Sequence, residues 1–168
     1  PVFSIWIRPV PHENGPFTLK AAWYELDKLV REGLTEEEFA ATRDFLDKYC
    51  ALLQQSDDRR LGYALDQRWH GVTDWLPFVR ERLAALDVAT VNEAIRRHLR
   101  SDRLQMVVVT DDAARFRDAI LGDAPTPITY QTEPGPEILA EDAEIAPLRP
   151  QLVPDAVRIV PIDEVFVR

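Results

Sequence analysis

The chain of 168 residues contains one cysteine, Cys50, and three histidines, His12, His70 and His98. A single cysteine cannot form a disulfide within the chain, so cysteine usage does not indicate a redox compartment. The histidines are isolated from one another, and neither His-x-x-Glu-His nor His-Glu-x-x-His occurs. Because zinc sites usually place a close pair of ligands on one element, we predict no metal site and no cofactor in this chain.

Long hydrophobic runs are also missing. No apolar stretch approaches the roughly 18 residues of a membrane span, and no signal-peptide pattern is present. There is no initiator methionine, since the sequence begins with Pro1 inside a strand-like pattern. We therefore expect a piece of a longer protein without a membrane span, and the bacterial periplasm and cytoplasm both remain open as its location.

Positive charge is scarce, because 20 lysines and arginines face 29 aspartates and glutamates for a net charge of −9. The electrostatic field of a chain with this net charge repels nucleic acid. The one basic stretch, residues 96–100 with Arg103, lacks interleaved aromatic side chains. We interpret it as cations at the negative end of a helix dipole and predict no nucleic-acid partner.

Residues for nucleophilic or acid–base catalysis are present without the context that catalysis requires. Three serines and Cys50 lie in a strand pattern, at helix ends or on a helix, and none is in a nucleophile elbow. The acidic clusters at 36–38, 57–58 and 111–112 are explained by helix capping and the helix dipole. We predict no catalytic residue.

The strongest local signal is a corner between two helices. Gly33 is suited to ending a helix in the left-handed conformation. Thr35 and Glu38 have the spacing of a capping box, and Leu34 and Phe39 have that of a hydrophobic staple. The stretch therefore predicts one helix ending at Gly33 and another beginning after Thr35.

Apolar periodicity of three and four predicts helices elsewhere along the chain. Gly71 is expected to end one of them, and Asp87 and Asp111 to begin two others. The predicted helices are 17–32, 36–55, 59–69, 75–85, 88–99 and 113–121.

Two segments have the pattern of strands. Residues 2–8 alternate in polarity, and residues 104–110 form a β-branched run. Residues 157–160 either add an edge strand or dock as an extended segment. We predict an α+β fold, with a helix-rich layer packed on an antiparallel or mixed sheet. Because a two-stranded sheet is marginal in water, we expect the missing strands to lie upstream of Pro1.

The composition of the chain changes after residue 130. Residues 131–155 are rich in proline and acidic residues and have little periodicity. We predict an α+β domain over 1–130, a partial half of a larger unit, followed by an extended arm over 131–168 that packs on it.

Five side chains are candidates for an interface. Phe3, Ile5 and Ile7 form an apolar strand face that few residues of this chain can cover, and Trp6 lies on the opposite face. Trp75 begins a helix after a turn, where a contact between domains and an ordinary core role are equally favoured. The unpaired strand 2–8 also favours a homodimer formed through its exposed edge.

Taken in order, these motifs resemble the second, zinc-free half of the pitrilysin/insulinase family of zinc metallopeptidases, the inverzincins. The likeness covers nearly the whole chain up to Tyr130. The segments that carry it are 3–7, 29–33, 34–39, 59–64, 69–71, 86–91, 105–110 and 127–130.

The resemblance implies one half-domain of a clamshell that closes on an unfolded peptide, truncated at its N-terminal strands. Zinc and its His-x-x-Glu-His motif would belong to the other half, supplied by the upstream part of the same chain or by a homologous zinc-bearing subunit. The family's substrate-holding Arg and Tyr would lie upstream of Pro1, and Arg60 and Tyr63 do not match them. This chain would be inactive alone and would form part of the peptide chamber.

Two alternatives stay open at this point. The same fold also serves as an inactive scaffold or core subunit with a structural or protein-interaction role. An unrelated helical regulatory domain would instead fold as a stable monomer with no exposed strand edge.

Overall fold

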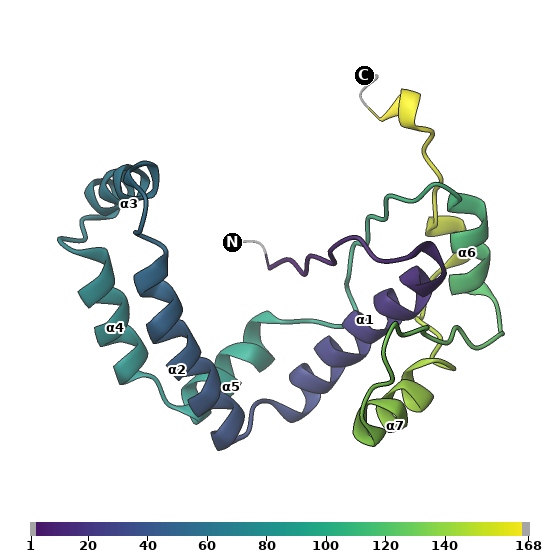
Figure 1. Ribbon diagram of the computed structural model, residues 1–168, viewed down its shortest axis with the longest axis horizontal. Helices are drawn as coiled ribbons and strands as arrows, with labels where there is room; N and C mark the ends of the chain where they lie inside the picture. The colour runs from purple at the N-terminus through teal and green to yellow at the C-terminus, as the bar shows by residue number, and fades with distance from the viewer. Residues whose placement is uncertain (1–2, 166–168) are drawn as a thin grey trace. The chain divides into compact units, whose positions relative to one another are not determined.

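The computed structural model describes residues 3–165, and all the regular structure in that part of the chain is helical (Figure 1). The chain divides into two compact units. Unit 1 consists of Pro1–Lys28 and Arg100–Arg168, and unit 2 consists of Leu29–Leu99.

Unit 1 is built from two parts of the chain that are far apart in sequence. Its buried apolar side chains include Phe17, Leu26, Ile120 and Ile145. Its helices are η1 (His12–Asn14), the first part of α1 (Gly15–Glu32), α6 (Ala113–Leu121), α7 (Pro136–Ile145), η2 (Pro154–Ala156) and η3 (Ile162–Glu164).

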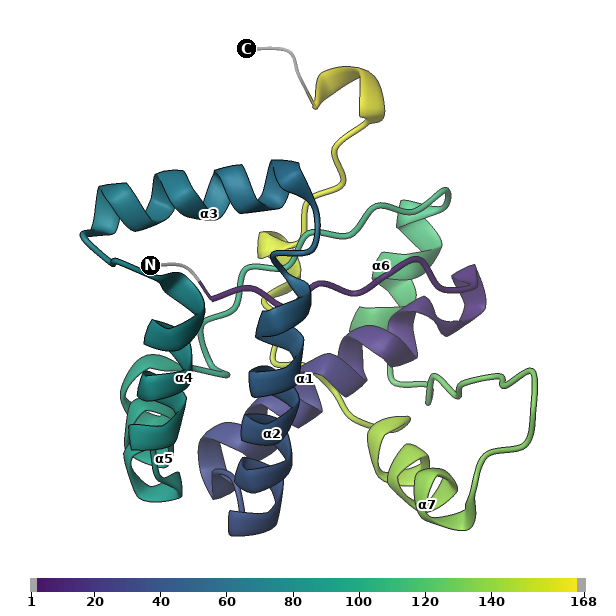
Figure 2. The same cartoon turned by 60° about the vertical axis from the view of Figure 1, so that its left-hand side comes forward.

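Unit 2 is one continuous stretch of helices, and α1 ends in it. Helices α2 and α4 lie side by side in both views (Figures 1 and 2), where Arg80 donates to the Asp47 carboxylate at 2.8 Å. Phe39, Cys50 and Ile95 are its buried apolar residues within the described chain. Its helices are α2 (Glu36–Leu52), α3 (Asp57–His70), α4 (Trp75–Ala85) and α5 (Val88–His98).

The predicted corner between α1 and α2 is confirmed. The Glu38 N–H donates to Thr35 Oγ1 at 3.2 Å, and the Thr35 N–H donates back to the Glu38 carboxylate at 2.8 Å. Gly33 has φ of 75°, the left-handed conformation expected for it. The Asn92 carboxamide of α5 also holds the corner, because it accepts from the Leu34 N–H at 2.7 Å and donates to the Leu34 carbonyl at 2.9 Å.

Other helix ends agree with the sequence to within a few residues. Gly71 ends α3 with φ of 69°, and Asp87 caps α5 by accepting from the Thr90 N–H at 2.7 Å. The cap of α6 is Asp112 rather than the neighbouring Asp111. Local side-chain-to-backbone bonding of this kind depends on residues three apart, which is why it can be read from sequence.

The predicted α+β fold is wrong, because the described residues contain no strand and no sheet. Residues 3–11 and 104–110 are extended, but no backbone ladder joins either to another described segment. Val107 and Val109 are 92% and 93% exposed. The alternation and β-branching that suggested strands are real, but a strand also requires a neighbour that accepts and donates its main-chain hydrogen bonds.

The acidic segment after residue 130 also differs from its prediction as an extended arm, because residues 136–145 form α7. Pro136 lies in the first turn of this helix, where its missing N–H costs nothing, and Glu137 adds favourable negative charge there. Within residues 3–165, no helix combines the length and apolar character needed to cross a membrane.

Candidate functional site

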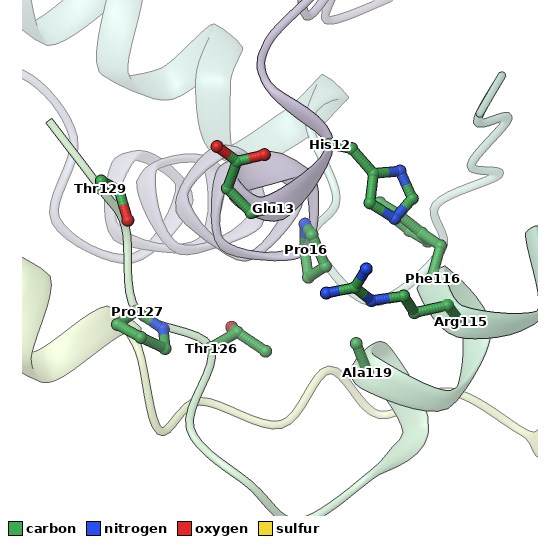
Figure 3. A pocket seen from close by; sticks show the side chains of 9 residues that line it. All are labelled: His12, Glu13, Pro16, Arg115, Phe116, Ala119, Thr126, Pro127 and Thr129. Carbon is green, nitrogen blue, oxygen red and sulfur yellow. The ribbon is translucent and has the colours of Figure 1, made fainter. Parts of the chain in front are cut away.

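A hollow of about 230 Å³ opens in unit 1 where α1 begins (Figure 3). We call it the α1 pocket. Three segments that are distant in sequence line it: the start of α1 with η1, one side of α6, and the loop between α6 and α7. Its lining residues are His12, Glu13, Pro16, Arg115, Phe116, Ala119, Thr126, Pro127 and Thr129.

Asn14 fixes the loop between α6 and α7 against the start of α1. Its side chain is buried, donates to the Thr129 carbonyl at 2.8 Å and accepts from the Thr129 N–H at 2.9 Å. The Asn14 carbonyl also accepts from the Thr18 hydroxyl at 2.8 Å. Two opposed bonds from one carboxamide replace a pair of backbone bonds, so the pocket wall is held in a defined position.

His12 is held at the rim of the pocket by a carboxylate. Its Nδ1 lies 2.8 Å from Asp111 Oδ1 and 3.1 Å from the Thr110 hydroxyl. A proton on Nδ1 satisfies this arrangement. Nε2 has no hydrogen-bond partner among the described residues.

Thr126 contributes a buried polar atom that is unsatisfied within the described residues. Its backbone N–H donates to the Ala146 carbonyl at 3.0 Å, whereas its hydroxyl oxygen is buried without a hydrogen-bond partner. Leaving a buried hydroxyl unpaired costs about 1–3 kcal/mol, so such atoms usually meet a water or a ligand.

Arg115 supplies a cation from α6. Its backbone N–H is bonded to the capping carboxylate of Asp112 at 2.9 Å, which fixes the residue in the first turn of the helix. The guanidinium points into the pocket, whereas the Glu13 carboxylate points away from it (Figure 3). No ion pair to Arg115 occurs within the described residues.

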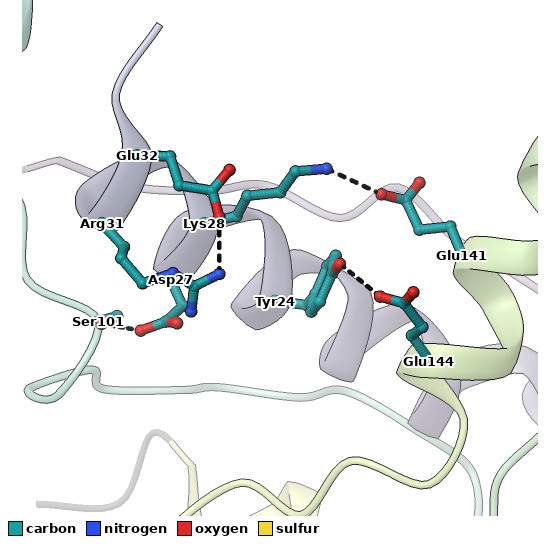
Figure 4. Close-up of polar contacts among 8 residues, drawn as sticks. All are labelled: Tyr24, Asp27, Lys28, Arg31, Glu32, Ser101, Glu141 and Glu144. Carbon is teal, nitrogen blue, oxygen red and sulfur yellow. Dashed lines mark hydrogen bonds and ion pairs between the residues drawn. The ribbon is translucent and has the colours of Figure 1, made fainter.

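A polar cluster joins α1 to α7 on another side of unit 1 (Figure 4). The Tyr24 hydroxyl donates to Glu144 at 3.1 Å, and the Lys28 ammonium donates to Glu141 at 3.1 Å. These hydrogen bonds raise the pKa of Tyr24 and the pKa of Lys28. We expect the cluster to hold α7 rather than to act chemically, because both carboxylates are engaged.

Neutralising both carboxylates, Glu141→Gln with Glu144→Gln, should lower the urea midpoint of unfolding slightly at pH 7. Exposed pairs of this kind contribute little and are screened by salt, so the difference should disappear in 1 M NaCl. Since both pKa values are raised, the contribution is full below the ordinary pKa values of 10.0 and 10.5 and is lost as pH rises beyond them. The control is Glu133→Gln, which removes an exposed carboxylate that has no hydrogen bond or ion pair among the described residues. A lowered urea midpoint that persists in 1 M NaCl would contradict the expectation that these pairs contribute little.

The predicted interface residues fall into two groups. Phe3, Ile5, Trp6 and Ile7 lie together in the extended segment of unit 1, and all four are exposed, Trp6 at 89%. Trp75 belongs to unit 2, where its ring lies 4.4 Å from that of Tyr63. It therefore has an aromatic neighbour within its own unit.

Unit 2 has a hollow of its own, about 290 Å³ in volume, between the end of α3 and the start of α4. Asp66, Gln67 and His70 form its polar side, and Val72, Trp75 and Phe78 its apolar side. Of these residues, Trp75 is the one that the sequence marks as an interface candidate.

Sequence reasoning missed the α1 pocket. Its residues come from three segments, and no sequence motif links those segments to one another. Within residues 3–165, no group of three or more His, Cys, Asp or Glu side chains is arranged to hold a metal ion. Comparisons with protein-family models, curated proteins and solved structures give no match to this chain.

Proposed function

We propose that this chain is the non-catalytic part of a zinc-dependent peptidase of the pitrilysin/insulinase type, forming part of the chamber that holds an unfolded peptide. The observation that carries the proposal is the pair of extended segments, 3–11 and 104–110. Both expose apolar side chains, and their main-chain groups form no ladder with the described residues.

Exposed extended segments of this composition suit an assembly with another protein surface. Main-chain N–H and C=O groups in an extended conformation can be satisfied by a second extended backbone, either in a partner domain or in a bound peptide. Val107 and Val109 are almost fully exposed on one face of the second segment, at a spacing of two. A zinc-bearing domain or subunit that covers these groups is the partner that the proposal requires.

In such an assembly this chain would position the peptide, and the zinc site elsewhere would supply the chemistry. Holding a flexible peptide near the metal-activated water turns an encounter between separate molecules into a reaction within one complex. This division of roles agrees with the order of the sequence motifs, which includes none for a zinc ligand.

The test compares the chain with the complete product of the gene that encodes it. We expect the complete product to carry His-x-x-Glu-His, bind zinc and cleave a quenched fluorescent peptide in a chelator-sensitive reaction. Residues 1–168 alone should neither bind zinc stoichiometrically nor cleave the peptide. Stoichiometric zinc and cleavage by the isolated chain would contradict the proposal, and a complete product without the motif or activity would favour a scaffold role.

A pair of surface variants tests the extended segment directly. Val107→Asp with Val109→Asp should lower the activity of the complete product about tenfold, because the aspartates would introduce charge into the covered face. The control is Ile162→Asp, at a residue that is 79% exposed in η3. Equal activity of both variants would remove the assigned role of residues 104–110. Sedimentation of the isolated chain at several dilutions would show whether the exposed segments also pair between two copies.

A further inference from the structure

We propose that the α1 pocket binds a carboxylate group of a peptide. That the ligand is a peptide rests on the proposed function, whereas the carboxylate chemistry rests on the pocket itself. The pocket combines a cation, a buried hydroxyl and an apolar floor, and each has a separate role in recognition.

The cation is Arg115, whose guanidinium enters the pocket and has no ion-pair partner among the described residues. A guanidinium presents parallel N–H donors that match the two oxygens of a carboxylate. Other described arginines, such as Arg96 and Arg103, also have no ion pair within residues 3–165, and Arg115 differs from them because it lines the pocket. Arg117, on the same helix, pairs with Asp118 at 2.9 Å.

The hydroxyl is that of Thr126, whose oxygen is buried beside the pocket without a hydrogen-bond partner and meets a ligand there only after the side chain rotates. A threonine hydroxyl can donate one hydrogen bond, and a carboxylate is an acceptor at both oxygens. His12 lies at the rim with Asp111 on the Nδ1 side of its ring, and its Nε2 can donate to a carboxylate only when the ring carries both protons. These groups surround one small volume from different segments, as expected of a site for a compact polar group.

The remaining walls of the pocket favour a carboxylate that is attached to an apolar residue. Pro16, Phe116, Ala119 and Pro127 supply apolar surface, and about 230 Å³ accommodates a terminal group with one side chain. A phosphate dianion is less well matched, because Pro16 has no N–H to offer at the start of α1 and the chain is strongly acidic. The carboxylate can come from a peptide C-terminus or from an internal Asp or Glu.

Binding of short synthetic peptides to the full chain tests the proposal by calorimetry. The probes are acetyl-Ala-Ala-Leu as the free acid, the same peptide as its amide, and an amidated peptide with one internal aspartate. We expect the free acid to bind at least about tenfold more tightly than the amide. If the aspartate peptide binds as tightly as the free acid, the pocket accepts a carboxylate from either source, which also supports the site. Equal binding of acid and amide with no gain from aspartate would overturn it, as would tighter binding of inorganic phosphate.

Matched variants locate the binding in the pocket. Arg115→Gln should weaken binding of the free acid about tenfold and leave binding of the amide unchanged. Arg117→Gln, on the same helix with its guanidinium paired to Asp118, should leave both unchanged. Thr126→Val keeps the shape of the side chain and should weaken the free acid about threefold. If Arg115→Gln and Arg117→Gln behave alike, the carboxylate site is disproved.

These outcomes are separable from those of the proposed function. The binding assay needs no zinc and no partner, so a complete product without peptidase activity would leave a carboxylate site intact. Conversely, loss of carboxylate binding would leave the zinc and cleavage results of the complete product unaffected.

Discussion

Replacing Gly33 by alanine is expected to lower the free energy of unfolding of unit 2 by about 2–3 kcal/mol. The left-handed conformation, with φ of 75°, costs a residue with a Cβ about 1–2 kcal/mol. A Cβ at this position would also lie 2.6 Å from Asn92 Oδ1. The carboxamide would then move and weaken its two bonds to Leu34, each contributing about 1 kcal/mol.

Two other glycines separate these causes. Gly71→Ala has the strain without the clash, because φ is 69° and nothing lies within 4 Å of the added Cβ, so we expect a loss of about 1 kcal/mol. Gly62→Ala, within α3 and also unobstructed, should stabilise by up to about 1 kcal/mol through helix propensity. Urea unfolding followed by circular dichroism ranks the stabilities of the three variants. Amide hydrogen exchange in α2 and α5 shows whether the loss of stability is confined to the corner. A Gly33→Ala loss no larger than that of Gly71→Ala would exclude the Asn92 contact as a cause.

Replacing Lys20 by methionine is expected to stabilise unit 1 by about 1–2 kcal/mol at pH 7. Lys20 is only 2% exposed, and within the described residues its ammonium makes one hydrogen bond, to the Ala146 carbonyl at 3.2 Å. That carbonyl also accepts from the Thr126 N–H, so removing the lysine leaves no unpaired acceptor. A buried charge with few partners is costly, and an unbranched apolar side chain can fill the same space.

The gain should depend on pH in a defined direction. Burial, with a smaller contribution from nearby Arg149, lowers the pKa of Lys20 below its ordinary value of 10.5. Between the lowered pKa and 10.5 the unfolded chain binds the proton more strongly, so the wild-type protein gains stability as pH rises. The advantage of Lys20→Met should therefore shrink as pH approaches 10.5.

The difference between the wild-type and variant unfolding curves isolates this effect, because the other alkaline groups are common to both. Lys20→Ala serves as the control, since it removes the charge but also leaves a cavity and should lose stability relative to Lys20→Met. If Lys20→Met is less stable than wild type at pH 7, the ammonium contributes more through its contacts than burial costs.

Local chemistry explains why the helices of this protein can be predicted from sequence. The Thr35–Glu38 capping box, the Asp87 cap and the Gly71 terminator each depend on residues within four positions of one another. The sequence does not predict helix α7, because Pro136 and the acidic residues around it also suit an extended segment. The first turn of a helix accepts both.

Strands and the pocket depend on contacts that sequence patterns do not specify. Residues 104–110 have the β-branched composition of a strand, but composition does not provide a hydrogen-bonded neighbour. The α1 pocket joins Pro16, Arg115 and Thr126, and no local signal links them. Asn92 was likewise not singled out, because its role follows from its distance to Leu34 rather than from its own helix.

The discontinuity of unit 1 has a consequence for the order of events during synthesis. Residues 29–99 leave the ribosome as one continuous stretch, so unit 2 can begin to fold while unit 1 is still incomplete. The Asn14–Thr129 and Lys20–Ala146 bonds span 115 and 126 positions. At roughly 5–20 residues per second, the first residues of unit 1 wait several seconds or more for their partners. Over that interval Phe17 and Leu26, which are buried in the folded unit, remain accessible to chaperones, and the emergence of α7 sets the earliest time at which the unit can close.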